Sequence, residues 1–373
     1  MNPGGSPRIF VSAGEPSGDV HAAHVVRALL RRWPGAVIDA FGGPAIAAAG
    51  ATVRFPMERY TVIGFFEVLA KIPAHLRLLR ELTRDFRAGR YDLVIPVDYP
   101  GFNIRLSEAA KHAGARSLYY IAPQLWAWRP GRARRFAAAV NGVAVILPFE
   151  PEFFGKVGVP VRFVGHPLVE QARPDRAAAR RALGLGAEER AVAVFPGSRG
   201  QEVSRLWPLF RETTTRLKSG GAITRVLVAG TAHHEYPESG DAVIVRGDAA
   251  MVLAAADAAL VKSGTTTLEA ALADTPMVVS YRVHPITAAI ARRVMTVQWI
   301  SLVNLVAGRA VVPELVQDQA TPEALAAAVA PLLERGGPSA SEQRAGLALV
   351  RERLGAPGAA ERVVDMAEAV LAA

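Results

Sequence analysis

The chain has 373 residues, which is enough for two or three domains and a large buried core. Hydrophobic residues make up 51% and charged residues 21%, a composition that excludes an intrinsically disordered chain. Because cysteine is absent, disulfides, thiolate metal sites and a cysteine nucleophile are excluded, and a reducing compartment fits. The net charge of +9 favours anionic partners such as phosphates.

The beginning of the chain carries no sign of a targeting segment. Residues 1–7 lack an apolar stretch and run directly into a strand-like sequence, so we expect no signal peptide and a cytosolic protein. Uncharged stretches such as Val294–Gly308 fall short of the ~18 apolar residues that cross a bilayer. Any membrane contact is therefore expected to be peripheral.

Short β-rich runs alternate with alanine- and arginine-rich segments of helical spacing, a pattern that predicts parallel α/β construction. The first series of expected strands is Arg8–Ser12, Val37–Phe41, Leu93–Val97, Ser117–Ile121, Val143–Leu147 and Val161–Val164. The second series is Ala191–Phe195, Arg225–Ala229, Ala242–Val245, Ala258–Val261 and Met277–Tyr281. Two Rossmann-like parallel-sheet domains that face a cleft are therefore expected.

A Gly-His-Pro turn near residue 165 ends the first strand series and marks the expected domain boundary. The expected domains are residues 1–170 and 171–340, followed by a terminal helical segment, residues 341–373. A break at Gly336-Gly337-Pro338 precedes this segment, so its helix is free to pack back on the first domain.

In open parallel sheets, ligands bind beyond the carboxyl ends of the strands, so polar residues directly after a strand are candidates for function. The first candidate loop precedes a helix expected to begin near Val20. Gly14 and Gly18 in this loop allow close backbone approach to an anion or a sugar. The alternative is a capped turn with Ser17 or Asp19 as the N-cap. The loop lacks G-x-G-x-x-G spacing, which argues against a dehydrogenase.

Asp98 directly follows the expected strand Leu93–Val97. A carboxylate at such a position can accept a proton from an attacking hydroxyl, and apolar surroundings would raise its pKa toward a useful value. The alternative is an Asx-turn before Pro100-Gly101.

Ser198 and Arg199 follow the strand Ala191–Phe195 in a short glycine turn. The permanently charged guanidinium can neutralise a departing diphosphate in place of a metal. The alternative is a helix cap in which Arg199 pairs with Glu202 at the surface.

Another candidate loop joins the strand Ala258–Val261 to a helix. Its hydroxyls and free N–H groups converge at a helix N-terminus, where the dipole favours phosphate. Glu269 lies one helical turn beyond Thr265 and could accept hydrogen bonds from a ribose diol. This combination indicates a nucleotide site, and the alternative is threonines that only cap the helix. The candidate residues are Ser263, Gly264, Thr265, Thr266 and Glu269.

No metal site is predicted, because His233-His234-Glu235 stands on a loop without further suitably spaced ligands. Trp126 and Trp128 precede a run of arginines, which is either a solvated helix face or a patch for anionic lipid. The apolar segment 62–69 is either an ordinary core helix or part of an acyl-chain groove.

Motifs spread over nearly the whole chain resemble the lipid-A-disaccharide synthase family, inverting glycosyltransferases of the GT-B fold. Each motif alone is weak, but together they are highly specific. They are Gly14-Glu15-Pro16-Ser17-Gly18-Asp19, Val97-Asp98-Tyr99-Pro100-Gly101-Phe102-Asn103, residues 119–123 with Trp126 and Trp128, residues 147–150, Phe163-Val164-Gly165-His166-Pro167-Leu168, Pro196-Gly197-Ser198-Arg199, Ser263-Gly264-Thr265, residues 300–305, residues 307–309 and Val312-Pro313-Glu314-Leu315.

The resemblance implies transfer of 2,3-diacylglucosamine from its UDP derivative to the 6-hydroxyl of 2,3-diacylglucosamine 1-phosphate, which forms a β-1,6 disaccharide and UDP. It implies an acceptor site in the first domain, a UDP-sugar site in the second, and a general base that is Asp98 or Glu15. It adds Asn103, His166, Asn304 and Glu314 to the substrate-binding residues.

The partners implied are the two acylated sugars and a membrane surface, on the inner face of the inner membrane of a Gram-negative-type bacterium. No cofactor, metal or nucleic acid is expected, and an oligomer is left open.

Two other functions remain open at this point. One is a different enzyme of the same fold, such as a UDP-N-acetylglucosamine 2-epimerase or a peptidoglycan-type glycosyltransferase, because nucleotide loops alone do not determine the acceptor. The other is a non-catalytic protein that binds a nucleotide sugar or a lipid, in which Asp98 would be dispensable.

Overall fold

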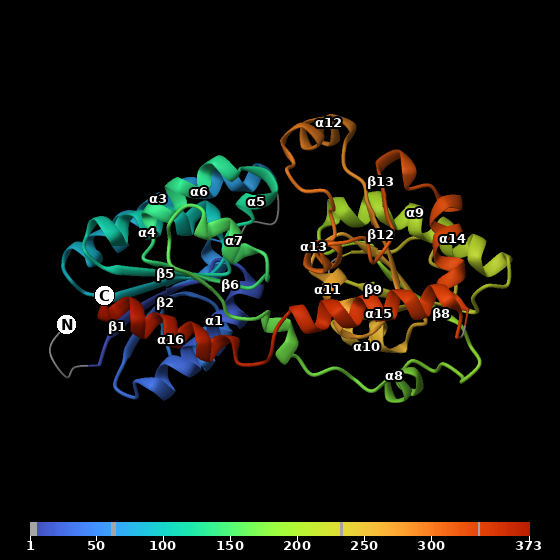
Figure 1. Ribbon diagram of the computed structural model, residues 1–373, viewed down its shortest axis with the longest axis horizontal. Coiled ribbons are helices and arrows are strands. Elements are labelled where there is room, and N and C mark those ends of the chain that lie inside the picture. The colour runs from blue at the N-terminus through green and yellow to red at the C-terminus, as the bar shows by residue number, and fades with distance from the viewer. Residues whose placement is uncertain (1–5, 61–64, 232–233, 335) are drawn as a thin grey trace. The chain divides into compact units, whose positions relative to one another are not determined.

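The computed structural model describes residues 6–60, 65–231, 234–334 and 336–373. The chain divides into two compact units (Figure 1). Unit 1 comprises Met1–Pro167 and Ala356–Ala373, and unit 2 comprises Leu168–Gly355. Each unit contains one fully parallel sheet with helices on both of its faces, so the predicted two-domain α/β fold is confirmed.

The sheet of unit 1 has seven strands in the order β3-β2-β1-β4-β5-β6-β7. The strands are β1 (Arg8–Ser12), β2 (Val37–Gly42), β3 (Thr52–Pro56), β4 (Leu93–Pro96), β5 (Arg116–Tyr120), β6 (Gly142–Val145) and β7 (Val161–Phe163). The helices are α1 (Pro16–Arg32), α2 (Pro44–Ala48), α3 (Phe65–Arg87), α4 (Pro100–His112), α5 (Leu125–Trp128), α6 (Ala133–Ala139), α7 (Glu150–Gly155) and α16 (Ala359–Ala372).

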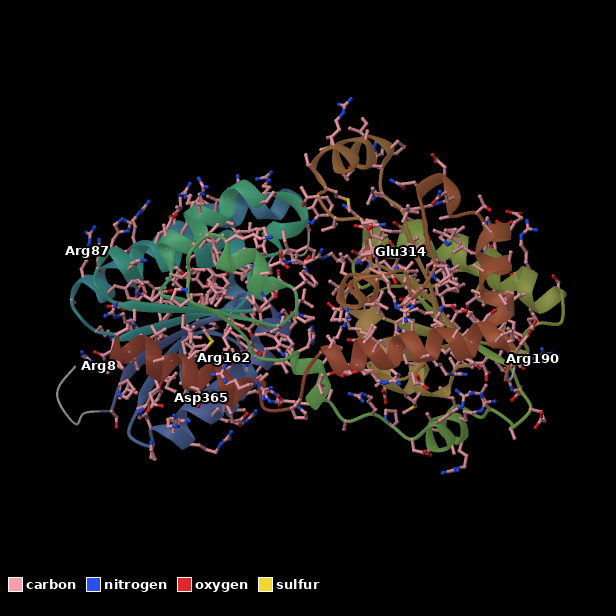
Figure 2. The ribbon with its side chains drawn as sticks, viewed as in Figure 1. Arg8, Arg87, Arg162, Arg190, Glu314 and Asp365 are labelled. Atoms are coloured by element: carbon pink, nitrogen blue, oxygen red, sulfur yellow. The ribbon has the colours of Figure 1, made fainter. Side chains whose placement is uncertain are left out.

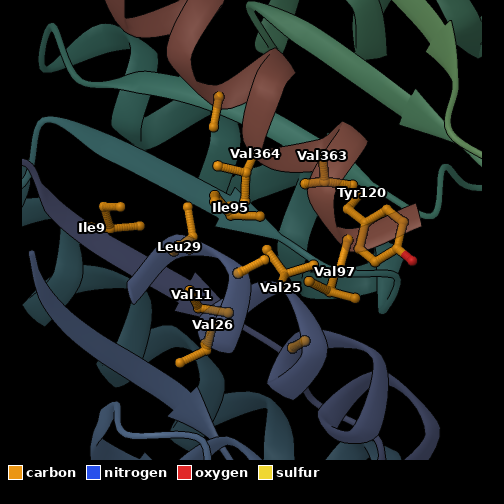
Figure 3. Packing of buried hydrophobic residues seen from close by; sticks show 14 of the residues in the cluster. Ile9, Val11, Val25, Val26, Leu29, Ile95, Val97, Tyr120, Val363 and Val364 are labelled. Carbon is orange, nitrogen blue, oxygen red and sulfur yellow. The ribbon is translucent and has the colours of Figure 1, made fainter. Parts of the chain in front are cut away.

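The two faces of this sheet are covered by different helices because successive strand residues point to opposite sides. Ile9 and Val11 of β1 pack with α1 and α16 in one core (Figure 3). Phe10, which lies between them, packs instead with α3 and α4. Since both faces are buried, the central strands are almost continuously apolar, and this is why the sequence shows them clearly.

The last helix of the chain, α16, belongs to unit 1. Its residues Val363 and Val364 lie in the same core as Ile9 and Val11 (Figure 3). On its outer side, Asp365 (Figure 2) accepts a hydrogen bond from Arg32 at 2.7 Å. The segment before it turns at Gly355 and Gly358, which both have positive φ.

The sheet of unit 2 has six strands in the order β10-β9-β8-β11-β12-β13. The strands are β8 (Ala191–Phe195), β9 (Arg225–Gly230), β10 (Val243–Arg246), β11 (Ala258–Lys262), β12 (Met277–Tyr281) and β13 (Glu314–Val316). The helices are α8 (Arg176–Ala182), α9 (Gly200–Ser219), α10 (Ala249–Ala255), α11 (Thr266–Leu272), α12 (Pro285–Val294), α13 (Leu302–Ala307), α14 (Pro322–Val329) and α15 (Pro338–Arg353).

The observed helices and strands differ from the predicted ones in three respects. The first helix begins at Pro16 rather than near Val20, because Pro is favourable at the first helical position. The expected terminal helix is divided into α15 and α16, because Pro357 and the two glycines beside it cannot continue a helix. The short strands β3 and β13 were missed. They lie at the sheet edges, where no residue of β13 and only Phe55 of β3 is buried, so their apolar pattern is weak.

Within the described residues, no helix is both long and apolar enough to cross a bilayer. The side chains of the apolar segment 62–69 lie outside the described residues.

Candidate active site

In unit 1, the direction of strand order reverses between β1 and β4, because β2 and β3 lie beyond β1 while β5 to β7 lie beyond β4. Such a switch point leaves a crevice at the carboxyl ends of the two strands, where open α/β sheets bind ligands. The segment 13–19 follows β1, and Asp98 follows β4 by two residues. The two predicted loops therefore meet at this switch point.

Asp98 stands on an unusual backbone. Asp98 and Tyr99 have φ values of 46° and 50°, in the left-handed region that residues other than glycine rarely adopt. The carbonyl of Asp98 accepts hydrogen bonds from Asn103 Nδ2 at 2.8 Å and from the Tyr119 hydroxyl at 2.7 Å. These two buried donors hold the strained turn in place, and strain of this kind is concentrated at functional sites.

The carboxylate of Asp98 has a raised pKa. Burial and then the negative charge of nearby Glu15 raise the pKa of Asp98 to about 6, against a hydrogen bond from the Tyr99 backbone N–H. A carboxylate with such a pKa is still ionised at neutral pH and is a stronger base than an ordinary aspartate. The carboxylate of Glu15 therefore lies close enough to Asp98 at the switch point for its charge to raise the pKa of Asp98.

An aromatic residue closes one side of this site. The ring of Tyr99 packs on Gly14, where a Cβ atom would lie 2.3 Å from the ring. Its hydroxyl lies 2.8 Å from Nε2 of His75 on α3. Gly14 is thus required for the approach of the two loops. Tyr99 and His75 are site residues that the search of strand ends did not single out.

Other predicted residues of unit 1 have their side chains engaged by the fold. Asp19 accepts hydrogen bonds from the N–H groups of Gly43 and Ala45, at 2.7 and 2.9 Å, and so caps α2. Asn103 is fully buried, and its Oδ1 also accepts a hydrogen bond from the Ser12 hydroxyl at 2.6 Å. These two residues shape the loops from beneath. Two further predicted residues precede Asp19 in α1. Ser17 is exposed and Gly18 is buried.

His166 lies buried near the end of unit 1, after β7. Burial and then the nearby His21 lower the pKa of His166 to about 3, so the imidazole is neutral at physiological pH.

In unit 2, strand order reverses between β8 and β11. The turn 196–199 follows β8 and the turn 263–266 follows β11, so both predicted loops stand at this second switch point. Between them lies a cavity of about 580 Å³. The predicted residues that line it are Ser198, Arg199, Ser263, Gly264, Thr265 and Thr266.

The polar side chains of this cavity include donors without a partner. Among the described residues, no hydrogen bond or ion pair engages the hydroxyls of Ser198, Thr265 and Thr266 or the guanidinium of Arg199. Ser198, Arg199 and Thr265 are exposed, and Thr266 is half-buried. Free donors gathered at the starts of two helices are suited to an anionic ligand.

Glu202 holds the turn that carries Ser198 and Arg199. Its carboxylate accepts the backbone N–H groups of Ser198 at 3.1 Å and Arg199 at 3.4 Å, and it lies 2.9 Å from Lys262 Nζ. The alternative prediction joined a helix cap to a surface pair between Arg199 and Glu202. The cap is confirmed, because Arg199 is the N-cap of α9 and Glu202 accepts its backbone N–H. The pair is wrong, because Lys262 is the cation that pairs with Glu202. The Arg199 guanidinium stays available.

Glu269 lines a neighbouring cavity of about 870 Å³, which shares Gly247 and Ala249 with the first. Its side chain is half-buried, and burial raises the pKa of its carboxyl group. It makes no hydrogen bond within the described part of unit 2. An unpaired carboxylate beside the anion cavity can accept hydrogen bonds from sugar hydroxyls.

Asn304 and Glu314 are engaged by the fold. Glu314 (Figure 2) accepts the N–H groups of Ile300 and Ser301, at 2.8 and 3.0 Å, and the side-chain amide of Asn304 at 2.8 Å. The hydroxyl of Ser263 donates to the carbonyl of Ile300 at 2.7 Å. This network attaches the second loop of the cavity to the segment before α13.

Several residues of the cavity were not among the predicted site residues, although Lys262 directly precedes the predicted loop that begins at Ser263. Gly230, Thr231, Gly247 and Lys262 also line it. Each lies at or just beyond the carboxyl end of β9, β10 or β11, so the same search applied to every strand of unit 2 would have found them.

Among the described residues, no group of three or more His, Cys, Asp or Glu side chains is arranged to hold a metal ion.

Comparison with known proteins agrees with the predicted resemblance. The family model described as Lipid-A-disaccharide synthetase matches residues 9–361. The lipid-A-disaccharide synthase of Azotobacter vinelandii is 44% identical over 343 residues, which cover 88% of this chain and 90% of the relative.

Solved structures share the fold at low sequence identity. The calicheamicin glycosyltransferase CalG4 has a TM-score of 0.59 and 18% identity, with 100% of this chain and 99% of that chain covered. A putative UDP-N-acetylglucosamine 2-epimerase from Listeria monocytogenes has a TM-score of 0.66 and 13% identity, with 98% and 96% covered. These two likenesses concern the fold, whereas the family match extends along the sequence. The chain therefore belongs to the lipid-A-disaccharide synthase family of glycosyltransferases.

Proposed function

We propose that the protein transfers 2,3-diacylglucosamine from UDP-2,3-diacylglucosamine to the 6-hydroxyl of 2,3-diacylglucosamine 1-phosphate. The products are the β-1,6-linked disaccharide 1-phosphate and UDP. Membership of the lipid-A-disaccharide synthase family supports this reaction. One observation supports the assignment of different roles to the two units. Hydrogen-bond donors without a partner among the described residues lie at the switch point of unit 2, whereas a basic carboxylate lies at the switch point of unit 1.

Unit 2 is the donor half of the proposed site. The Arg199 guanidinium and the hydroxyls of Ser198 and Thr265 bind the diphosphate, together with free N–H groups at the start of α11. Glu269 accepts hydrogen bonds from the ribose hydroxyls in the adjoining cavity. Arginine keeps its charge at every relevant pH, so it stabilises the diphosphate most as negative charge develops on the leaving group.

Unit 1 is the acceptor half, and Asp98 is its general base. The carboxylate takes the proton of the acceptor 6-hydroxyl while that oxygen forms a bond to the anomeric carbon of the donor. The bond from this carbon to the UDP oxygen breaks, and UDP leaves with the electron pair. Attack from the face opposite UDP inverts the anomeric configuration. Glu15 keeps the pKa of Asp98 raised, and it is the alternative base.

Both substrates carry acyl chains, so the enzyme has to work at a lipid surface. We place it as a peripheral protein on the inner face of the inner membrane of a Gram-negative-type bacterium. Its net charge of +9 favours anionic lipid.

The test is incubation of the full chain with both acylated sugars in detergent, followed by mass analysis. The expected result is a disaccharide 1-phosphate together with UDP in equal amounts. No disaccharide should form when the acceptor sugar is left out. Release of a free sugar without acceptor would instead indicate an epimerase, and binding of UDP-sugar without any turnover would indicate a non-catalytic protein.

A further inference from the structure

Helix α12 of unit 2 exposes an apolar stripe. Ile286, Ile290 and Val294 have relative exposures of 66%, 57% and 43%. They follow one another at intervals of four residues, so they lie along one side of the helix. Among the described residues, no other helix exposes three large apolar side chains. Isolated exposed apolar residues are ordinary, but a continuous stripe on one helix indicates a contact surface.

The segment just before α12, residues 282–283, is hydrogen-bonded to the rest of unit 2. Arg282 donates hydrogen bonds to the carbonyls of Gln317 and Ala320, at 3.3 and 2.6 Å, and the Val283 N–H donates to Gln317 Oε1 at 3.1 Å. The ribbon places α12 clear of β12 and β13, at the end of its two connections (Figure 1). Within α12, Ala288 is buried. The helix is thus fixed at its base while its apolar stripe faces outward.

Along the sequence, the segment that carries the stripe has charged residues of one sign only. The sequence contains no Asp or Glu between Asp274 and Glu314, whereas the same segment contains four arginines. Arg293 is exposed and lies beside the stripe, between Ile290 and Val294 in sequence. A long basic side chain next to apolar residues can place its stem in an acyl layer and its charge at the headgroups.

The size of the stripe decides between a lipid and a protein partner. A ten-residue helix is about 15 Å long. A stripe of that length on a helix about 10 Å across has an area on the order of 150 Å², far less than the ~800 Å² that each partner contributes to a stable protein interface. A membrane surface requires only a shallow apolar face together with basic residues.

We propose that α12 is a membrane-docking helix, which lies in the plane of an anionic bilayer with Ile286, Ile290 and Val294 among the acyl chains and Arg293 at the headgroups. The inference rests on the proposed function in one respect, because acylated substrates require a lipid surface. Beyond that function, the inference identifies α12 as the helix of unit 2 that contacts the lipid surface.

The experiment measures binding of the full chain to vesicles by flotation. The vesicles contain phosphatidylethanolamine and phosphatidylglycerol, and vesicles of phosphatidylcholine alone are the uncharged comparison. A variant that combines Ile286→Ser, Ile290→Ser and Val294→Ser removes the stripe. We expect its partition into the anionic vesicles to fall at least about tenfold. The matched control is Val37→Ser, which replaces an equally exposed residue of unit 1 and should bind as the unmodified protein does.

A second variant, Arg293→Glu, tests the charge without changing the apolar stripe. It should weaken binding to the anionic vesicles about tenfold and leave binding to phosphatidylcholine unchanged. UDP binding and turnover in detergent should stay the same in both variants, because α12 contributes no residue to the donor cavity. These two readouts also show that the variants are folded.

Undiminished vesicle binding by the folded triple variant would overturn the proposal, and so would an unmodified protein that fails to float. A triple variant that keeps vesicle binding but loses a dimer in sedimentation would assign the stripe to a second copy of the chain instead. Failure of the proposed function would appear separately, as an absence of disaccharide from the unmodified protein in detergent.

Discussion

Trp126 donates its indole N–H to the carboxylate of Glu150 at 3.0 Å, inside unit 1. Glu150 also accepts the backbone N–H of Leu147 at 3.0 Å and is 1% exposed. Burial raises the pKa of Glu150 to about 7, against these hydrogen bonds. The contact between α5 and the first turn of α7 is therefore sensitive to pH near neutrality.

The fluorescence of Trp126 should report this titration. Because the folded protein binds the Glu150 proton more tightly than the unfolded chain, the associated stability is complete below about pH 4.5 and is lost as the pH rises through about 7. We expect a change in tryptophan emission with its midpoint near pH 7. Glu150→Gln should abolish the change, and Trp126→Phe should remove its signal. A midpoint that persists in Glu150→Gln would contradict the assignment.

Replacement of the proposed base should affect the rate far more than donor binding. Asp98→Asn removes the proton acceptor, so kcat should fall ~10²- to 10⁴-fold. The affinity for UDP, measured by calorimetry, should remain within about twofold, because the donor residues belong to unit 2. A variant with nearly unchanged kcat would show that Asp98 is not the base.

Glu15→Gln is the matched control for this prediction. Since the charge of Glu15 raises the pKa of Asp98, its removal should shift the acidic limb of the kcat profile below its expected position near pH 6. Activity should still be lost as the pH falls, because the base has to be ionised. A large fall in kcat at every pH, with Asp98→Asn active, would assign the base to Glu15.

Arg199→Ala should weaken UDP binding by about 1.5–3 kcal/mol, the range of a hydrogen bond to a charged group. The guanidinium lines the donor cavity and has no partner among the residues that the structure describes, so its loss removes a direct contact with the ligand. Arg205→Ala is a suitable control, because Arg205 is exposed on α9, the helix that Arg199 precedes, but does not line the cavity. Equal losses from both variants would indicate a general charge effect.

Glu314→Gln should destabilise the protein by about 1–3 kcal/mol, because an amide nitrogen cannot accept the hydrogen bonds that the carboxylate receives. Urea unfolding measures this loss, and Gln298→Ala at an exposed position is the control. If stability is retained while UDP affinity falls, Glu314 contacts the ligand directly.

The position of the candidate sites could be read from the sequence, because glycines and polar residues directly after apolar strands are local patterns. Asp98, Arg199 and Thr265 are examples, and all three lie at switch points. The sequence could not show which polar residues have their groups engaged. The family resemblance implies that Asn103 and Asn304 bind substrate, but both side chains are engaged by neighbouring loops and strands.

The contact between Glu202 and Lys262 was missed for the same reason. The two residues are distant in sequence, and they meet only because β8 and β11 are neighbours in the sheet. Pairing between strands that are not consecutive depends on the whole fold, so no local pattern announces it.

The return of α16 to unit 1 bears on how the chain folds during synthesis. The core around Ile9 and Val11 is covered partly by Val363 and Val364, which are translated only after the whole of unit 2. Unit 2 is one continuous segment, so all of it emerges while the first sheet still lacks this cover. Unit 2 can thus complete its core first, and the nascent unit 1 exposes an apolar face until α16 has been synthesised.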